Sequence, residues 1–260
     1  MSDTELAATA ASEAGVPAAG GGAAAVPAPG FRHFHEQLKD LKERLLEMSE
    51  RAESLLATSV EAFLRRDAAK AEAVVPADAE VDLLEVEIEQ LAISLLALQQ
   101  PMARDLRFII SAIRIAGDLE RVGDHAVNIA QSALRMVELR SGVNPPPEIA
   151  DMALRSRKML GDALDAVVRL DGVLGRDVCR RDDQVDALHE SVFRILLTHM
   201  MEDPSTISAA LELLLVSRNL ERVADLATNV AEDAVYLAEG KTIKHHLEDR
   251  PAPAVPPPQA

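Results

Sequence analysis

The chain has 260 residues, of which 48% are hydrophobic but only 2% are aromatic, and it contains no Trp. This composition argues against a sheet protein, because strands favour aromatic and β-branched residues, and it favours long helices. The 43 acidic residues outnumber the 27 basic ones and give a net charge of −16, so we expect no binding to nucleic acid.

Three features of the chain bear on its compartment. The single cysteine, Cys179, cannot form an internal disulfide, so a reducing compartment is the default expectation. Apolar runs such as Leu213–Val216 are far shorter than the ~20 residues of a membrane-spanning helix. The N-terminus carries Asp3 and Glu5 and lacks the basic and apolar regions of a signal peptide. We therefore expect a cytoplasmic protein without membrane insertion.

Both ends of the chain have the composition of disordered tails. Residues 1–30 consist mainly of Ala, Gly, Pro and small polar residues, and residues 245–260 are rich in Pro. Such segments hold too little apolar surface to offset the entropy that ordering would cost. We therefore expect the folded body between these two tails.

The first half of this body predicts three long helices. Over Phe31–Arg66, apolar residues recur at spacings of three, four and seven. Pro76 suits the first turn of a second helix over Ala77–Gln99, because its missing N–H is not needed there. Pro101 ends that helix, and Ala103–Leu139 forms a third, on the order of 55 Å long.

The second half repeats this plan. Ser141–Pro147 contains a glycine and three consecutive prolines, which mark a boundary between two units. Three further helices are expected over Glu148–Leu170, Arg176–Met201 and Ser205–Glu239, with a turn over Asp171–Gly175 between the first two. The predicted fold class is therefore all-α, with two tandem, homologous three-helix bundles over residues 31–140 and 146–244.

The third and sixth predicted helices carry the same motif. Gly117–Ala130 reads GDLERVGDHAVNIA, and Arg218–Ala231 reads RNLERVADLATNVA, 101 positions further on. In each copy a Glu and an Asp stand four apart and share one helix face with apolar residues. We expect that face to be buried, where a carboxylate is costly unless it is paired or binds a cation. The acids are Glu120 and Asp124 in the first copy, and Glu221 and Asp225 in the second.

A second acid pair opens the preceding helix in each half. Asp78 and Asp82 are four apart, and so are Asp182 and Asp186. Neighbouring antiparallel helices can bring the two pairs of each half to the same height, because both lie at comparable distances from the turn between them. Each bundle is then expected to hold four converging carboxylates, which cannot all stay ionised without a counter-charge.

The charge of the four carboxylates could be compensated in three ways. A metal ion could lie between the carboxylates, since oxygen-rich sites suit hard cations and iron. The acids could instead face water, or nearby arginines could pair with them. The repetition of both pairs at matched positions favours the metal, with Asn128 and Asn229 as neutral ligands or as plain surface amides. The arginines near in sequence are Arg114, Arg121, Arg218 and Arg222.

A catalytic site has less support. A di-iron or ferritin-like centre needs Glu-x-x-His on two helices, whereas the residue three positions after Glu120 or Glu221 is Gly or Ala. His189 follows Asp186 by three, but the other half has Glu85 at the matching position. The chain also lacks a glycine-rich phosphate loop between a strand and a helix. A carboxylate-bridged metal store or metalloenzyme stays as an alternative to a non-catalytic role.

The combined pattern resembles one known family. Residues 101–130, PMARDLRFIISAIRIAGDLERVGDHAVNIA, strongly resemble the first repeat of the PhoU family of bacterial phosphate-signalling accessory proteins. Residues 218–237, RNLERVADLATNVAEDAVYL, are similar to its second repeat. The second half departs from the pattern, since residues 205–208 read Ser-Thr-Ile-Ser where residues 104–107 read Arg-Asp-Leu-Arg. The resemblance covers roughly 33–244 and implies six helices in two similar bundles.

The resemblance also implies a function. PhoU-like proteins are regulators rather than enzymes, and they form homodimers. They act with the ATPase subunit of the phosphate transporter and a phosphate-sensing histidine kinase, repress phosphate-starvation genes and restrain uptake. Multinuclear clusters of iron, zinc, manganese or magnesium are implied on the acid pairs. Here these pairs are Asp78, Asp82, Glu120 and Asp124 in one half, and Asp182, Asp186, Glu221 and Asp225 in the other.

Overall fold

The computed structural model describes residues 29–139 and 142–243, and all regular structure in them is helical. The prediction of an all-α fold with six long helices in two bundles is confirmed. The predicted tails lie outside the described residues, except that the first helix already begins at Pro29. The helices are α1 (Pro29–Arg65), α2 (Ala68–Leu98), α3 (Ala103–Leu139), α4 (Pro147–Arg169), α5 (Gly172–Glu202), the short 3₁₀ helix η1 (Pro204–Thr206) and α6 (Ile207–Glu239).

Helix α2 begins nine residues earlier than predicted. Asp67 caps it by accepting a hydrogen bond from the Lys70 backbone N–H at 3.1 Å, and Pro76 lies inside the helix. A proline there leaves the carbonyl four residues earlier, at Glu72, without its helical partner. Because Glu72 and Val75 are exposed, that carbonyl can be hydrated, and the helix continues through the proline.

Helix α5 also begins earlier than predicted, at Gly172. Asp171 caps it by accepting from the backbone N–H groups of Val173 and Leu174, both at 3.0 Å. Gly175 is not a turn residue but a packing residue, because a Cβ there would lie 2.8 Å from the Ala231 carbonyl oxygen of α6. The glycine therefore allows α5 and α6 to approach closely.

The duplication is visible in two matching turns. Arg66 and Leu170 both adopt φ of 53°, the left-handed conformation that often ends a helix. Asp67 and Asp171 follow them and cap the next helix. These turns lie 104 positions apart, three more than the offset between the motif helices. The first two helices of each bundle therefore correspond at a spacing of 104.

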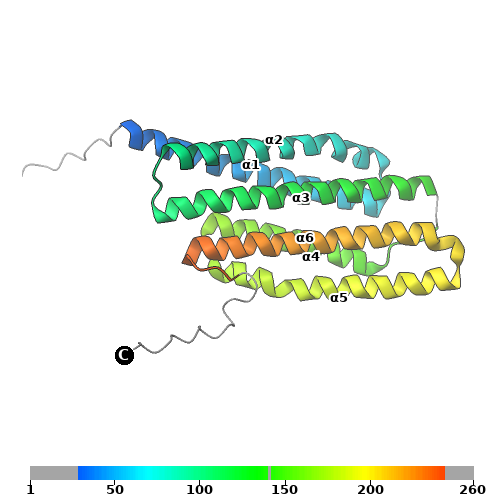
Figure 1. The fold of residues 1–260 in the computed structure, drawn as a ribbon. Helices are drawn as coiled ribbons and strands as arrows, with labels where there is room; N and C mark the ends of the chain where they lie inside the picture. The colour runs from blue at the N-terminus through cyan, green and yellow to red at the C-terminus, as the bar shows by residue number, and fades with distance from the viewer. Residues whose placement is uncertain (1–28, 140–141, 244–260) are drawn as a thin grey trace, which may run out of the picture.

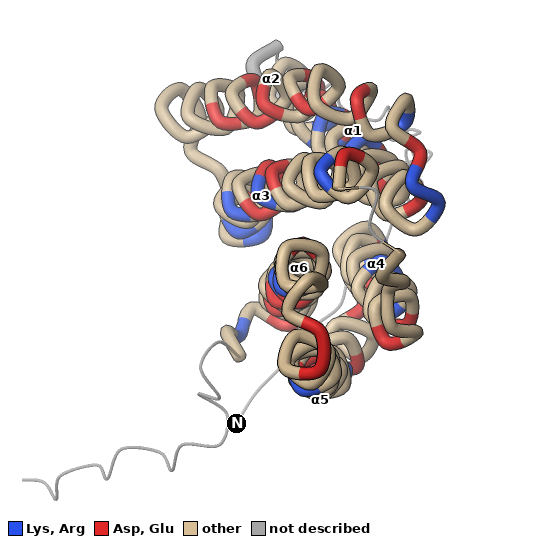
Figure 2. Tube along the Cα trace, turned by 90° about the vertical axis from the view of Figure 1, so that its right-hand side faces the viewer, with Lys and Arg blue, Asp and Glu red and all other residues tan. Residues whose placement is uncertain are grey.

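The two bundles pack side by side along their length (Figure 1). Figure 2 shows α1–α3 in one group and α4–α6 in the other, with α3 facing α6. These two helices run in opposite directions, and α1 also touches α4. Buried apolar residues of both bundles form one continuous core. No helix of the described ranges is long and apolar enough to cross a membrane.

Two ion pairs cross the contact between α3 and α6. The Arg114 guanidinium lies 2.7 Å from an oxygen of Asp233, whose side chain is completely buried. Arg135 lies 2.8 Å from Glu212, whose side chain is 13% exposed. Since these carboxylates are withdrawn from water, each depends on its arginine for compensation.

Candidate metal centres

In the first bundle, packing brings the acid pairs of α2 and α3 together. The Asp78 side chain lies directly against Gly123, where an added Cβ would collide with Asp78 Oδ1. This Oδ1 is buried and has no hydrogen-bond partner. Glycine at 123 therefore creates the space that lets a carboxylate from α2 reach the surface of α3.

The first cluster is strained electrostatically. Burial, and then the charges of Asp82 and Asp124, raise the pKa of Asp78 to about 6. Burial also raises the pKa of Glu120, and Asp124, Glu85 and Asp82 add to this effect. Asp82 and Asp124 therefore lie close enough to Asp78 and Glu120 to oppose the ionisation of those two carboxyls.

The second cluster repeats this behaviour between α5 and α6. Burial, followed by the charges of Asp225 and Asp186, raises the pKa of Asp182 to about 7. Burial likewise raises the pKa values of Asp186 and Glu221, and Asp225 is the next largest cause for both. Asp182 Oδ1 is buried without a hydrogen-bond partner, as Asp78 Oδ1 is in the first cluster.

The face that carries these acids is not buried as predicted. Glu120 and Glu221 are half-buried, whereas Asp82, Asp124 and Asp186 are exposed. The reason is that the fully buried stripe of α3 lies beside this face and points into the core, which leaves the acids nearer to the surface. The buried stripe includes Ile115, Leu119, Val122, Ala126 and Ile129.

Among the described residues, arginine forms ion pairs with these acids in the second bundle and not in the first. Arg222 lies 2.8 Å from Asp225 and 3.4 Å from Glu221. In the first bundle Arg121 pairs instead with Asp118, at 3.6 Å, and acts on Glu120 only through its charge, while Arg114 pairs with a residue of α6. The arginine contacts of the two clusters therefore differ although their acids correspond.

The types of side chain in each cluster are those that bind metals, but the side chains are not oriented to coordinate one. Among residues 29–139 and 142–243, no three His, Cys, Asp or Glu side chains are arranged to hold a metal ion. A metal would require the carboxylates to turn toward one another. In favour of a metal, each cluster holds a buried carboxylate oxygen without a hydrogen-bond partner, on Asp78 and on Asp182. A bound cation would supply the missing partner and oppose the carboxylate repulsion.

A fifth residue lies at each cluster and was not predicted to belong to it. Glu85 raises the pKa of Glu120, and His189 lowers the pKa values of Asp186 and Glu221. These two residues correspond to each other at the spacing of 104, and each follows the first Asp of its pair by seven positions. That heptad spacing was the available signal, because it places the fifth residue on the same helix face.

The hydrogen bonds of His189 define its ring tautomer. The Ser217 hydroxyl donates its one hydrogen to the Leu214 carbonyl at 2.9 Å. It must therefore accept from His189 Nδ1, which lies 3.1 Å away. In the neutral ring the lone pair then lies on Nε2, and neutral imidazole is the form of histidine that binds metals.

The two asparagines do not lie in the clusters as ligands. Asn229 Nδ2 donates to Asp118 Oδ1 across the bundle contact, at 3.5 Å, and Asn128 is exposed. A second polar bridge joins the bundles nearby, where His125 Nδ1 lies 2.8 Å from Asn219 Oδ1. The side-chain amides of Asn229 and Asn219 therefore connect α6 to α3.

Comparison with known proteins extends over both bundles. The PhoU domain matches residues 45–133 and 149–234. A phosphate-specific transport system accessory protein PhoU homolog of Clostridium acetobutylicum is 38% identical over 211 residues, covering 81% of this chain and 96% of that protein. A protein of the same name from Caulobacter vibrioides is 42% identical over 201 residues, covering 77% of this chain and 87% of that protein.

Solved structures agree with this assignment. The crystal structure of PhoU from Pseudomonas aeruginosa is 35% identical with a TM-score of 0.78, covering 80% of this chain and 100% of that one. The phosphate transport system regulatory protein PhoU from Streptococcus pneumoniae is 28% identical with a TM-score of 0.74, covering 80% and 98%. Because the domain matches both bundles and these relatives share their fold and sequence, the chain belongs to the PhoU family.

Proposed function

We propose that this protein is a regulatory adaptor of phosphate homeostasis and not an enzyme. In this role it represses the phosphate-starvation genes and restrains high-affinity phosphate uptake when phosphate is plentiful. One observation carries the proposal: relatives that match across both bundles are named phosphate-specific transport system accessory proteins. The matched residues include all eight acids of the two clusters.

The proposed partners are the ATPase subunit of the phosphate transporter and a phosphate-sensing histidine kinase, met in the cytoplasm by a homodimer. The surface offers apolar positions for such contacts. Leu106 and Ile110 near the start of α3 are exposed, and so are Ile207 and Leu211 at the matching positions of α6. Exposed apolar side chains one helical turn apart, as in each of these two pairs, are suited to form part of a protein interaction site.

We further propose that each bundle binds metal through its cluster, as multinuclear centres of iron, zinc, manganese or magnesium. The metal would neutralise the carboxylates and link the second helix of each bundle to the third. The first cluster offers only carboxylates, including Glu85, and so suits Mg²⁺ or Mn²⁺. The second adds the His189 nitrogen, which suits zinc or iron.

Replacing Glu120 and Asp124 with Ala is expected to lower the metal content of the purified protein by about half, because the second cluster shares no ligand with the first. Elemental analysis after dialysis measures this content. The double variant Glu43→Ala/Glu47→Ala removes the same charge from exposed positions of α1 and is expected to keep the full content. Equal metal content in the two variants would count against the assignment of these ligands.

The second candidate function is a metal store or a carboxylate metalloenzyme. His189 at the second cluster favours it, because a nitrogen ligand beside carboxylates is common in iron sites. The first cluster has Glu85 in the corresponding place, so the Glu-x-x-His pattern of di-iron enzymes occurs in neither half. Catalytic oxidation of added Fe²⁺, with many turnovers per chain, would favour this candidate over the regulatory one.

Deletion of the gene is expected to switch on phosphate-starvation genes in phosphate-rich medium, because repression would lose its adaptor. Alkaline phosphatase activity measures this response. The full-length gene supplied in trans should restore repression, and so should a version without residues 1–28, which precede the described body. Normal repression in the deletion strain, with no second copy of the gene present, would overturn the regulatory proposal.

A further inference from the structure

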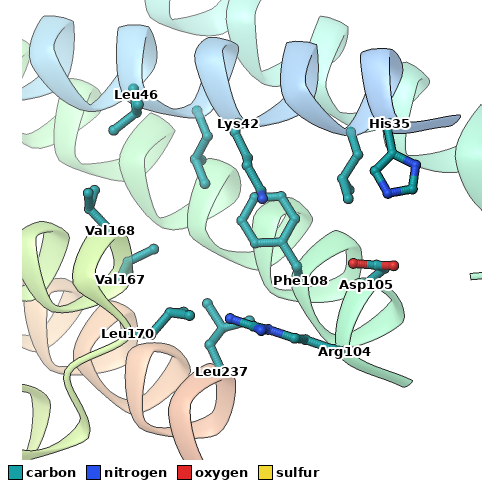
Figure 3. A pocket seen from close by; sticks show the side chains of 12 residues that line it. His35, Lys42, Leu46, Arg104, Asp105, Phe108, Val167, Val168, Leu170 and Leu237 are labelled. Atoms are coloured by element: carbon teal, nitrogen blue, oxygen red, sulfur yellow. The ribbon is translucent and has the colours of Figure 1, made fainter. Parts of the chain in front are cut away.

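A cleft of about 450 Å³ opens between the two bundles at the end where α3 begins and α6 ends. Figure 3 shows that α1, α3, α4 and α6 all contribute side chains to it. Its volume falls within the range of roughly 300–1,000 Å³ that small-molecule sites occupy. The cleft is separate from both carboxylate clusters, none of whose residues line it.

The rim of this cleft is cationic, although the chain as a whole is strongly acidic. Lys42 and Arg104 line it, and within residues 29–139 and 142–243 neither has a carboxylate within 4.0 Å. The Lys42 ammonium lies 5.2 Å from the centre of the Phe108 ring, and Arg104 extends along the cleft toward Leu237 (Figure 3). Asp105 is the one acid among the lining residues. Two unpaired cations around an opening favour an anionic ligand.

The walls of the cleft are apolar. Leu38, Leu45, Val167 and Leu237 line it, and each is less than a tenth exposed. A free inorganic phosphate is a strongly hydrated ion and would lose water against such walls without gaining hydrogen bonds. A ligand that is anionic at one end and apolar at the other matches both parts of the lining.

The matching place at the other end of the molecule differs. At the offset of 101, Arg104, Asp105 and Phe108 correspond to Ser205, Thr206 and Ala209, so both the cation and the ring are lost. The connection between the bundles lies there instead, since Gly142 and Val143 line the same hollow as those three residues. Arg66 holds this connection by donating to the Val143 carbonyl at 2.6 Å. The connection between the bundles therefore borders the hollow at one end, and none of its described residues lines the cationic cleft.

We propose that the cleft at the cationic end binds a small organic anion, with its anionic group between Lys42 and Arg104 and its apolar body against Phe108 and Leu237. This site gives a role to Arg104, the first residue of the Arg-Asp-Leu-Arg stretch that the second half lacks. It is independent of the metal centres and of the proposed regulatory role. The ligand class is set by charge and apolar area together.

The probe for this site is 8-anilinonaphthalene-1-sulfonate, which joins a sulfonate to an apolar ring system and fluoresces in apolar surroundings. We expect one tight site per chain in a fluorescence titration. The uncharged analogue N-phenyl-1-naphthylamine should bind at least about tenfold more weakly, because it cannot use the two cations. An equal concentration of inorganic phosphate should not displace the probe.

The variant Lys42→Gln/Arg104→Gln should weaken binding of the sulfonate by at least about tenfold. Lys39→Gln/Arg194→Gln removes the same charge from exposed pairs that do not line the cleft and should bind as the unaltered protein does. Both cleft residues are exposed, so the variant should keep its helical content. If it does not fold, the single variants Lys42→Gln and Arg104→Gln test the proposal instead. Each should weaken binding of the sulfonate about threefold or more.

Three results would overturn the proposal. Unchanged affinity in the cleft variant would place the probe on other apolar surface of the protein. Equal affinity for the charged and uncharged probes would remove the role of the cations. Displacement of the probe by inorganic phosphate would show a bare anion site without an apolar contribution.

Discussion

Metal is expected to raise the melting temperature of this protein strongly at pH 8 and only weakly at pH 5. A ligand that binds only the folded state stabilises it by about 2.7 kcal/mol per site when its concentration is a hundred times the dissociation constant. Two filled centres would therefore add roughly 5 kcal/mol at pH 8, if both bind with that affinity. Calorimetry of the protein with added Mn²⁺ and with chelator measures the difference.

The pH dependence follows from the raised pKa values. Asp78 and Asp182 have folded pKa values of about 6 and about 7, above the ordinary value of 3.8. A carboxyl whose pKa is raised by folding contributes stability at low pH, and this contribution is lost as the pH rises through the folded pKa. The chelated protein should therefore become less stable between pH 5 and pH 8. Metal binds the deprotonated carboxylates, so its stabilising effect should grow over the same interval.

The matched variant is Asp78→Asn/Asp182→Asn, which keeps the side-chain shape but removes both shifted groups. With chelator present, it should lose less stability than the unaltered protein between pH 5 and pH 8. It should also gain less from Mn²⁺ at pH 8. A metal effect that is equally large at both pH values would contradict the assignment of these carboxylates as ligands.

Replacing Arg114 with Ala is expected to lower the free energy of unfolding by about 3 kcal/mol. The reason is that Asp233 is fully buried and its Oδ1 lies 2.7 Å from Arg114. Without the guanidinium, a charged carboxylate stays in the core and loses this ion pair, while the Ser111 hydroxyl, at 3.4 Å, is a neutral partner that carries no compensating charge. Arg114 itself is 40% exposed, which places the effect at the lower end of the range for buried pairs. Urea denaturation in the presence of chelator measures it.

Two controls distinguish the effect of an uncompensated Asp233 carboxylate from an unspecific destabilisation of α3. The variant Arg114→Ala/Asp233→Asn replaces the carboxylate with a neutral amide and should recover much of the lost stability. Arg155→Ala breaks a half-exposed pair with Asp151, found at 3.0 Å, and should cost less than about 1 kcal/mol. If Arg114→Ala costs no more than Arg155→Ala, the pair across the bundles does not hold them together.

The local pattern of the sequence was sufficient for the helices and for the duplication. Apolar spacing identified all six long helices, because a helix that packs on a core repeats its apolar positions along the chain. The same regularity identified the eight acids, since a residue pair that recurs at a matched position needs no tertiary information to be noticed. It failed at Pro76 and at Gly175, which were taken for helix-start and turn signals although both lie inside helices. Whether such a residue ends a helix depends on exposure and on the neighbouring helix.

The partners of the charged residues were decided only by the tertiary structure. The sequence placed Arg114 among the counter-charges for the carboxylates, but the antiparallel packing of α3 on α6 directs it to Asp233 instead. The packing of α2 on α3 and of α5 on α6 leaves the acids exposed or half-exposed and brings Glu85 and His189 to the clusters, and the packing of the two bundles opens the cationic cleft at one end. Helical periodicity reflects contacts within a few residues along the chain and so was determined by the sequence itself. Burial and charge pairing join residues that are tens of positions apart within a bundle and more than a hundred apart between bundles, and only the arrangement of the six helices could decide them.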